Sequence, residues 1–346
     1  MRNALAILFL FFYTVSQAVP PRVFADGTLL RDRNGKTLTM RGINWSEPDL
    51  CDASDMARMK EWGVNVVRVW CDESSMIKSF DPTLGCPKVD LKAIATSASD
   101  NDVYVIFVLG DLDDQPANQA KPWRDSLLRE RFRRCLSITA SNLGSNPAVL
   151  AIEVQNEPPA GSNELEQYRS FNLDMARSIR LAAPETMVAI HGPFRLEDQD
   201  RRVVIPMRNI LYVRNFWEPY KFTHVKPAQR WPVSARQGNS WIDARISRIT
   251  AFMDTNQVPV MITEFGAMIH APGNDELLWT RAVLTSFERR KLHGIYWGYK
   301  SYRSSSFHLY YNTVDRAKPP VFNEWTDMLN LMKQWWKMNH ATMKAP

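Results

Sequence analysis

Two glutamates each close a short apolar run of the sequence. Glu157 follows the run 149–155, and Glu264 follows the run 258–263. A carboxylate at such a place is costly to bury unless it is paired or used in chemistry. Two carboxylates that face one cleft are what cleavage of a glycosidic bond needs, because one gives a proton to the leaving oxygen while the other attacks the anomeric carbon. Two isolated glutamates could equally be structural, so the elements that carry them must be considered.

Short runs rich in Val, Ile and Leu recur along the chain and alternate with longer segments of helical periodicity. Such runs are typical of strands that are buried on both faces. We expect strands at 38–44, 64–70, 103–109, 149–155, 186–190, 210–215, 258–263 and 294–297. We expect helices at 54–62, 91–101, 125–143, 164–183, 240–256, 275–290 and 323–338, with the weakest helical signal in the link 193–208.

Eight strands that alternate with helices predict an α/β fold, a closed (β/α)₈ TIM barrel, although an open doubly wound sheet would have a similar count. Asp-Gly and Asn-Gly turn signals within 24–36 predict a short N-terminal β-hairpin before the barrel. No linker or internal repeat interrupts the pattern, so we expect residues 19–346 to form a single domain. In a barrel the site forms where the strands end, and the fourth and seventh strands, which end at the two glutamates, can face each other there.

Five sequence blocks point to a known family. They are Arg41-Gly42-Ile43-Asn44-Trp45, Gly63-Val64-Asn65-Val66-Val67-Arg68, Asn156-Glu157-Pro158, Thr263-Glu264-Phe265-Gly266 and Tyr296-Trp297. Together they resemble the ordered blocks of glycoside hydrolase family 5, the cellulase and mannanase family of the large retaining clan. The segment 218–224 also resembles its bacterial endoglucanase-like members. The blocks span 41–297, most of the chain.

The resemblance implies a retaining enzyme with Glu157 as the acid/base and Glu264 as the nucleophile. It also implies that Arg68 is a cation near Glu264, where a guanidinium would hold the nucleophile ionised while Glu157 keeps its proton. A buried ion pair between Arg68 and Glu153 is the competing interpretation, since Glu153 lies on the same strand face as Glu157 by period-two alternation.

Two further residues take a role from the same resemblance. Asn156 would bind the sugar hydroxyl next to the reacting carbon. Trp297, at the end of the last expected strand, would stack on the sugar ring, and ordinary packing is its alternative role.

The sequence departs from the family at two strand ends. The third strand usually ends in a histidine, but here it runs into Gly110. The sixth usually offers a His-x-Tyr pair, and the aligned residues here are Asn215 and Trp217. Asn215 can still donate a hydrogen bond, whereas Trp217 offers only an indole N–H. We expect both to bind substrate, and these departures leave the substrate open.

Other aromatic residues could widen the cleft. Trp45 follows the first strand and is included among the expected substrate-binding residues, because polysaccharide chains stack on such rings. Further candidates are Trp70, Trp123 and Trp231. Most tryptophans in proteins are packed, so we expect only about half of these four to be exposed.

These features predict an endo-acting β-glycanase with β-1,4-glucan as the substrate. A mannan, a β-1,3-glucan or another glycan is the alternative within enzymes, and a carbohydrate-binding protein that has lost catalysis is the alternative outside them. We expect a monomer that acts on a polysaccharide or oligosaccharide without a cofactor. No Cys-x-x-Cys or His-rich spacing suggests zinc, so we predict no catalytic metal. The acidic loop 111–114 is expected to be ordinary surface, with a sugar or cation site as the minority interpretation.

Charge and the N-terminal segment bear on partners and location. The formal charge is +6, but the basic residues are scattered and no nucleic-acid motif accompanies them, which argues against a nucleic-acid partner. Arg2, the apolar run 4–15 and the small residues Ser16 and Ala18 predict an export signal cleaved after Ala18. A retained membrane anchor is the alternative, although the run is short for a bilayer. We therefore expect a secreted or periplasmic protein that has no membrane contact after cleavage.

An exported protein with four cysteines can form disulfides. Cys71 and Cys86 bracket a loop that contains Pro and Gly, which makes them the most plausible local pair. Cys51 and Cys135 allow other pairings, and four buried thiols are the alternative.

Overall fold

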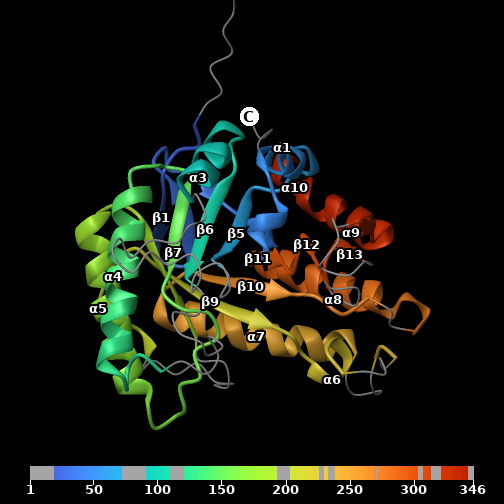
Figure 1. Ribbon diagram of the computed structural model, residues 1–346. Coiled ribbons are helices and arrows are strands. Elements are labelled where there is room, and N and C mark those ends of the chain that lie inside the picture. The colour runs from blue at the N-terminus through green and yellow to red at the C-terminus, as the bar shows by residue number, and fades with distance from the viewer. Residues whose placement is uncertain are drawn as a thin grey trace, which may run out of the picture.

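Eight parallel strands close into a barrel in the computed structural model (Figure 1). In chain order they are β4 Arg41–Trp45, β5 Val66–Cys71, β6 Tyr104–Leu109, β7 Val149–Glu153, β8 Met187–His191, β9 Ile210–Phe216, β10 Val260–Phe265 and β11 His293–Tyr296. Neighbours in the chain pair in parallel, and β11 pairs with β4 to close the ring. The structure describes residues 19–71, 91–109, 121–192, 203–225, 230–232, 238–269, 272–302, 307–312 and 321–341. The predicted (β/α)₈ barrel is confirmed.

The strands are buried on both faces because alternate side chains point into the barrel and out toward the helices. On β8, Met187 and Ala189 pack in the cluster inside the barrel, together with residues of β5, β6, β7 and β9. Val188 and Ile190 pack in the larger outer cluster with residues of the surrounding helices. This alternation determines which strand-end side chains face the site.

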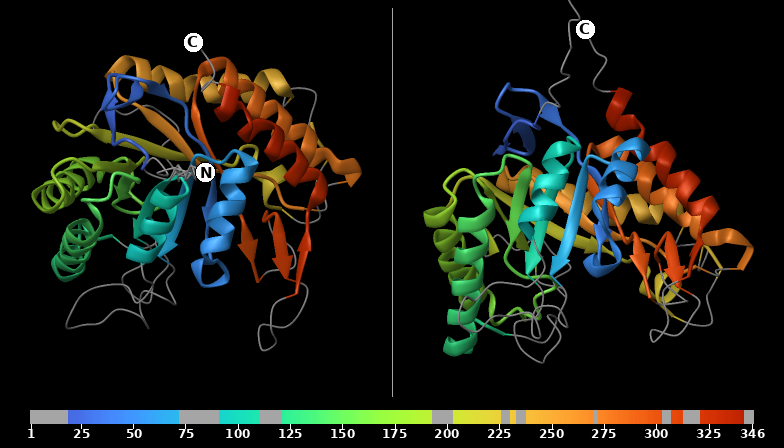
Figure 2. Two further views of the ribbon diagram at one scale, coloured as in Figure 1. Left: turned by 90° about the horizontal axis from the view of Figure 1, so that it is seen from above. Right: turned by 45° about the horizontal axis from the view of Figure 1, so that its top comes forward.

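The helices surround the barrel and pack on its outer face (Figure 2). They are α1 Ala53–Trp62, α3 Leu91–Asp100, α4 Ser126–Leu143, α5 Leu165–Ala182, α6 Tyr220–Thr223, α7 Asn239–Asn256, α8 Asp275–Arg290, α9 Thr326–Trp336 and α10 Met338–Ala341. α4 and α5 lie side by side on one flank, and α7 and α8 pack together on another. The start and end of α1 follow from local chemistry: Asp52 and Asp55 form a capping box, and Gly63 ends the helix with φ 94°.

A small antiparallel sheet covers the end of the barrel at which the strands begin. It consists of β1 Val23–Asp26, β2 Leu29–Asp32 and β3 Thr37–Leu38. Val23 and Leu30 belong to the same apolar cluster as the residues inside the barrel, so this sheet closes that end. The opposite end, where the strands finish, is left for the site. A second small sheet follows the barrel: β12 Lys300–Ser301, β13 Tyr310–Asn312 and β14 Phe322–Glu324.

The hairpin expected within 24–36 is confirmed as β1 and β2. Most of the link 193–208 lies outside the described residues, so the helix that is weakly indicated there stays a prediction. Cys51 and Cys135 are present as thiols, and Cys86 lies outside the described residues, so the pairing of Cys71 with Cys86 also stays a prediction. Among the described residues, none of the helices combines the length and apolarity that a membrane span requires.

Candidate active site

The guanidinium of Arg68 is the centre of a buried network at the ends of four strands. It donates from Nε and Nη2 to the two carboxylate oxygens of Glu153, at 2.7 and 2.8 Å. Nη1 donates to Glu264 Oε1 at 2.9 Å and to Asn44 Oδ1 at 3.1 Å, and Nη2 donates to Asn156 Oδ1 at 2.9 Å. Both interpretations of Arg68 are therefore correct: it is the partner of Glu153 and also the cation beside Glu264. Because the amide oxygen of Asn156 is engaged, its amide N–H₂ group is left to donate elsewhere.

An irregular step in β10 brings Glu264 into the barrel. Strict alternation from Met261, which packs inside, would turn Thr263 inward and Glu264 outward. The register with β9 shifts between Ile262 and Glu264, as at a β-bulge, so Glu264 pairs with Asn215. Thr263 Oγ1 then contacts Asn215 Oδ1 at 3.1 Å while Glu264, the next residue, contacts the guanidinium. Two consecutive side chains thus serve the same site.

Glu157 lies beyond the end of β7 and is partly exposed. Its φ is 42°, in the left-handed region that non-glycine residues rarely adopt, which is common at functional positions. Asn215 Nδ2 donates to Glu157 Oε1 at 2.6 Å. The donation from Thr263 to the amide oxygen of Asn215 fixes the orientation of that amide, so its N–H₂ group faces Glu157. One carboxylate oxygen of Glu157 is held by this bond, and the other is available for a proton.

The charges of the network act strongly on Glu264, which is only 4% exposed. Burial raises the pKa of its carboxyl to about 8, the Arg68 guanidinium opposes the rise, and the negative charges of Glu157 and Glu153 add to it. The Glu264 carboxyl therefore loses its proton near neutral to mildly alkaline pH in the free site. A buried carboxyl with a raised pKa and a specific charge partner makes Glu264 a candidate functional group.

Two of the expected tryptophans lie beside this network. Trp297 follows β11, is partly exposed, and packs its ring edge-on against Trp70, with 5.3 Å between the ring centroids. The guanidinium of Arg68 lies 5.1 Å from the ring centroid of Trp70. Trp297 thus lies beside the network through its contact with Trp70, and its stacking on a sugar ring stays a prediction.

Trp45 is not brought to the site, so its expected contact with substrate is corrected. It is 2% exposed, and its indole N–H points at Met59 Sδ, 3.1 Å away in α1. The reason is alternation along β4, which turns Asn44 inward to Arg68 and Trp45 outward to the helices. Trp123 and Trp231 are also buried in the outer core. Of the four candidates for a wider cleft, only Trp70 lies at the network.

Trp217 belongs to a cluster of rings beyond the end of β9. Its ring centroid lies 4.9 Å from that of His224 and 5.2 Å from that of Phe307. Tyr220 stacks on the other side of His224 and is 56% exposed. Trp217 is therefore held as part of a packed aromatic surface next to Asn215, whose side chain contacts Glu157. Gly110 and the acidic residues 111–114 lie outside the described residues.

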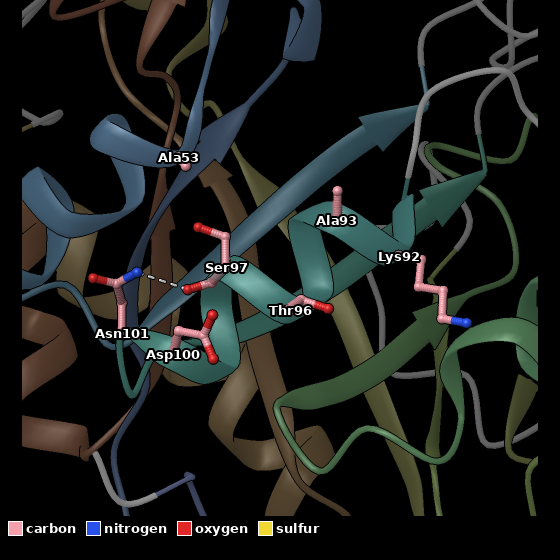
Figure 3. Close-up of a pocket in the computed structure, with 7 residues that line it drawn as sticks. All are labelled: Ala53, Lys92, Ala93, Thr96, Ser97, Asp100 and Asn101. Atoms are coloured by element: carbon pink, nitrogen blue, oxygen red, sulfur yellow. Dashed lines mark hydrogen bonds between the residues drawn. The ribbon is translucent and has the colours of Figure 1, made fainter. Parts of the chain in front are cut away.

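An open groove on the outer surface, along α3, is the hollow drawn in Figure 3. Its lining includes Lys92, Thr96 and Asp100, which project from a helix that covers the barrel. The one hydrogen bond drawn there, from Asn101 Nδ2 to the Ser97 carbonyl at 2.8 Å, is local to that helix end. The groove has none of the buried charge that marks the network at the strand ends.

Three residues of the site are not among those predicted from the sequence. Asn44, Thr263 and His191 all end or nearly end a strand and face the barrel interior, and Asn44 and Thr263 even lie inside the quoted blocks. Their common signal is a polar residue that closes an apolar run. Within the described part of the chain, no group of three His, Cys, Asp or Glu side chains is placed to hold a metal ion.

Comparison with known proteins decides the family. The sequence matches cellulase (glycosyl hydrolase family 5) over residues 31–303. The chain belongs to glycosyl hydrolase family 5. The resemblance drawn from the five blocks is confirmed, because the matched residues 31–303 contain all five.

Individual relatives of this family 5 glycoside hydrolase are distant. Endoglucanase N of Pectobacterium atrosepticum is 26% identical over 198 residues, which cover 54% of this chain and 41% of that protein. Endoglucanase 5 of Pectobacterium carotovorum subsp. carotovorum is 26% identical over 198 residues, which cover 54% of this chain and 36% of that protein. The match thus spans less than half of each curated relative. Thermotoga maritima Cel5A, solved in complex with mannotriose, has a TM-score of 0.66 and 19% identity, with coverage of 85% of this chain and 97% of that chain, and shares the fold.

Proposed function

We propose that this glycoside hydrolase is a retaining endo-β-1,4-glucanase in which Glu264 is the nucleophile and Glu157 the acid/base. The observation that carries the proposal is the contrast between the partners of the two carboxylates. Glu264 accepts a hydrogen bond from the cation Arg68, whereas Glu157 accepts one from the neutral amide of Asn215. A cation favours the anion needed for attack, while a neutral donor allows Glu157 to hold a proton and then release it.

Double displacement follows from these contacts. Arg68 engages Glu264 Oε1, so the other oxygen attacks the anomeric carbon while the bond to the leaving sugar breaks. Glu157 gives its proton to the leaving oxygen, and the bond from Asn215 then stabilises the carboxylate that remains. In the second step Glu157 takes a proton from water, the water oxygen bonds to the anomeric carbon, and the ester to Glu264 breaks.

Two further residues beside the network would bind the sugar. The amide N–H₂ group of Asn156, left free to donate by the bond from Arg68, would bind the sugar hydroxyl beside the reacting carbon. Trp297 would stack on the sugar ring. Support for a glucan comes from the names of the two curated relatives, both endoglucanases. Mannan is the second candidate, because a structural relative was solved with mannotriose.

The experiment is hydrolysis of a panel of soluble β-1,4-glucan, β-1,4-mannan and β-1,3-glucan by the protein expressed without residues 1–18, with Glu264→Gln as the control. We expect sugar to be released fastest from β-1,4-glucan, and the length of the glucan chains to fall early in the reaction. NMR should show that the first product formed has the β configuration. Faster release from mannan would replace glucan as the substrate. Oligosaccharide binding without release from any glycan would instead favour a binding protein that has lost catalysis.

We also propose that the protein acts outside the cytoplasm. The support is the sequence of residues 1–18, which has the pattern of a cleaved export signal. Determination of the N-terminal residue of the protein recovered from the medium or periplasm tests this, and Val19 is the expected result.

A further inference from the structure

A buried histidine at the end of the fifth barrel strand stands beside the catalytic network. His191 is the last residue of β8 and is 2% exposed. It follows Met187 and Ala189, which pack inside the barrel, so alternation turns its ring inward as well. The strand on one side pairs Ala189 with Glu153, and the strand on the other side pairs His191 with Val213, two residues before Asn215. The ring therefore lies between the strand of Glu153 and the strand of Asn215.

The hydrogen bonds of His191 define its chemical state. Nδ1 lies 2.7 Å from the carbonyl oxygen of Gly192, and a carbonyl only accepts, so Nδ1 carries the hydrogen. Burial lowers the pKa of the ring, although the nearby charges of Glu153 and Glu157 oppose that change. The ring is therefore neutral, and its Nε2 is a hydrogen-bond acceptor. Within the described structure this buried Nε2 has no partner.

An acceptor in this state calls for an O–H or N–H donor from a ligand, because a buried acceptor without a partner is destabilising. Three amide oxygens of the network are already engaged: those of Asn44 and Asn156 accept from Arg68, and that of Asn215 accepts from Thr263. His191 Nε2 differs from these three because no donor among the described residues reaches it. A sugar ring presents several hydroxyl donors to the floor of such a site.

We propose that His191 is a specificity-determining residue whose Nε2 accepts a hydrogen bond from a hydroxyl of the sugar held between Glu157 and Glu264. The proposal rests on the proposed function, since it places that sugar at the two glutamates. It also gives a role to the fifth strand, which supplied none of the residues predicted from the sequence. Glu264 is itself 4% exposed, so a sugar that reaches the nucleophile comes to the same depth as this ring.

Two substitutions separate the acceptor from the ring. In His191→Phe the ring volume is kept and the acceptor is removed. In His191→Gln an amide oxygen can take the place of Nε2. We expect His191→Phe to lower kcat/KM on aryl β-cellobiosides about 3- to 12-fold, the effect of one neutral hydrogen bond, and by the same factor for all leaving groups. His191→Gln should recover most of that loss.

Stability provides a readout that a purely structural histidine would not give. His191→Phe should melt close to the temperature of the unchanged protein, because the lost bond from Nδ1 to the Gly192 carbonyl is offset by replacing an unsatisfied buried acceptor with an apolar ring. The matched control is His293→Phe on β11, where the backbone N–H of Met40 donates to Nδ1 at 3.1 Å. That variant should melt lower, because it leaves a buried donor unpaired, while the folded molecules keep their kcat/KM.

The decisive arm uses cellobiosides in which single hydroxyls of the sugar next to the scissile bond are replaced by fluorine, which cannot donate. One such replacement should slow the unchanged protein and have no further effect on His191→Phe. Unchanged kcat/KM in His191→Phe would overturn the proposal, as would equal losses with a lower melting temperature in both variants. A loss in kcat/KM that grows with the basicity of the leaving group would mean that His191 acts on proton donation by Glu157. That result would also overturn the proposal.

Failure of the proposed function is distinguishable from failure of this inference. If the unchanged protein hydrolyses no β-glycan, the proposed function fails, and calorimetric binding of cellotetraose then decides the role of His191. Weaker binding by His191→Phe, restored in His191→Gln, would support the contact with sugar. Equal binding by the unchanged protein and both His191 variants would show that His191 makes no contact with the sugar.

Discussion

The bond from Asn215 to Glu157 leads to the sharpest prediction, for the variant Asn215→Ala. Asn215 Nδ2 lies 2.6 Å from Glu157 Oε1, and the bond strengthens as Glu157 loses its proton to the leaving sugar. Hydrogen bonds to charged groups contribute roughly 1.5–3 kcal/mol. Only the hydrogen-bond free energy that is gained between the ground state and the transition state affects the rate. The full range therefore sets an upper limit on the loss in kcat/KM on cello-oligosaccharides of roughly 10- to 150-fold.

The assay compares leaving groups, since kcat/KM reports the step in which the glycosidic bond breaks. Aryl β-cellobiosides with strongly acidic phenols need little protonation, so Asn215→Ala should change them less than about threefold. The control is Thr263→Val, which removes the hydroxyl that orients the Asn215 amide at 3.1 Å. It should produce a smaller loss with the same dependence on the leaving group. Equal losses for activated and natural substrates in Asn215→Ala would refute the reasoning.

Three further predictions concern the two glutamates and a second buried histidine. Glu264→Gln should lower kcat on every substrate on the order of 10⁴-fold or more. Glu157→Gln should lower kcat roughly 10²- to 10⁴-fold on natural glycans and far less on activated aryl glycosides. A variant with the rate of the unchanged protein would remove the role assigned to that glutamate. The active form needs Glu264 ionised and Glu157 protonated, so kcat/KM should pass through a maximum as the pH rises. Because burial raises the pKa of Glu264 to about 8, the rise on the acidic side should lie well above the ordinary carboxyl range, and a maximum reached below pH 6 would contradict this. Burial lowers the pKa of His293 to about 4, so the unfolded chain takes up that proton first, and stability should be lost as the pH falls from 6.5 to 4. The loss is roughly 3 kcal/mol at pH 4, and denaturant unfolding of His293→Gln should show it reduced.

Much of the fold and part of the site could be predicted from the sequence. Short apolar runs are strong evidence for buried strands, and the rule that strand ends form the site of a barrel is enough to bring Glu157 and Glu264 together. The sequence predicts either Glu153 or Glu264 as the partner of Arg68, and in the structure one guanidinium binds both carboxylates.

The rest depends on side-chain direction, which residue type does not reveal. The sequence predicts that Trp45 stacks on a sugar ring. The preceding residue, Asn44, faces the barrel interior, so Trp45 points outward to the helices. Glu264 would point outward by simple alternation, and only the shift of register before it turns the carboxylate in. The neutral state of His191 follows from one bond to Gly192, which no sequence pattern indicates.

The network around Arg68 has a consequence for how the protein acquires activity as it folds. Its partners lie at positions 44, 153, 156 and 264, on strands made early, midway and late in the chain. A partly folded chain that lacks β10 would hold the pair of Arg68 and Glu153 but not Glu264, the proposed nucleophile. We therefore expect hydrolysis to appear only after β10 has joined the barrel, whatever helix content circular dichroism then reports. Recovery of activity during refolding would time the docking of the seventh barrel strand.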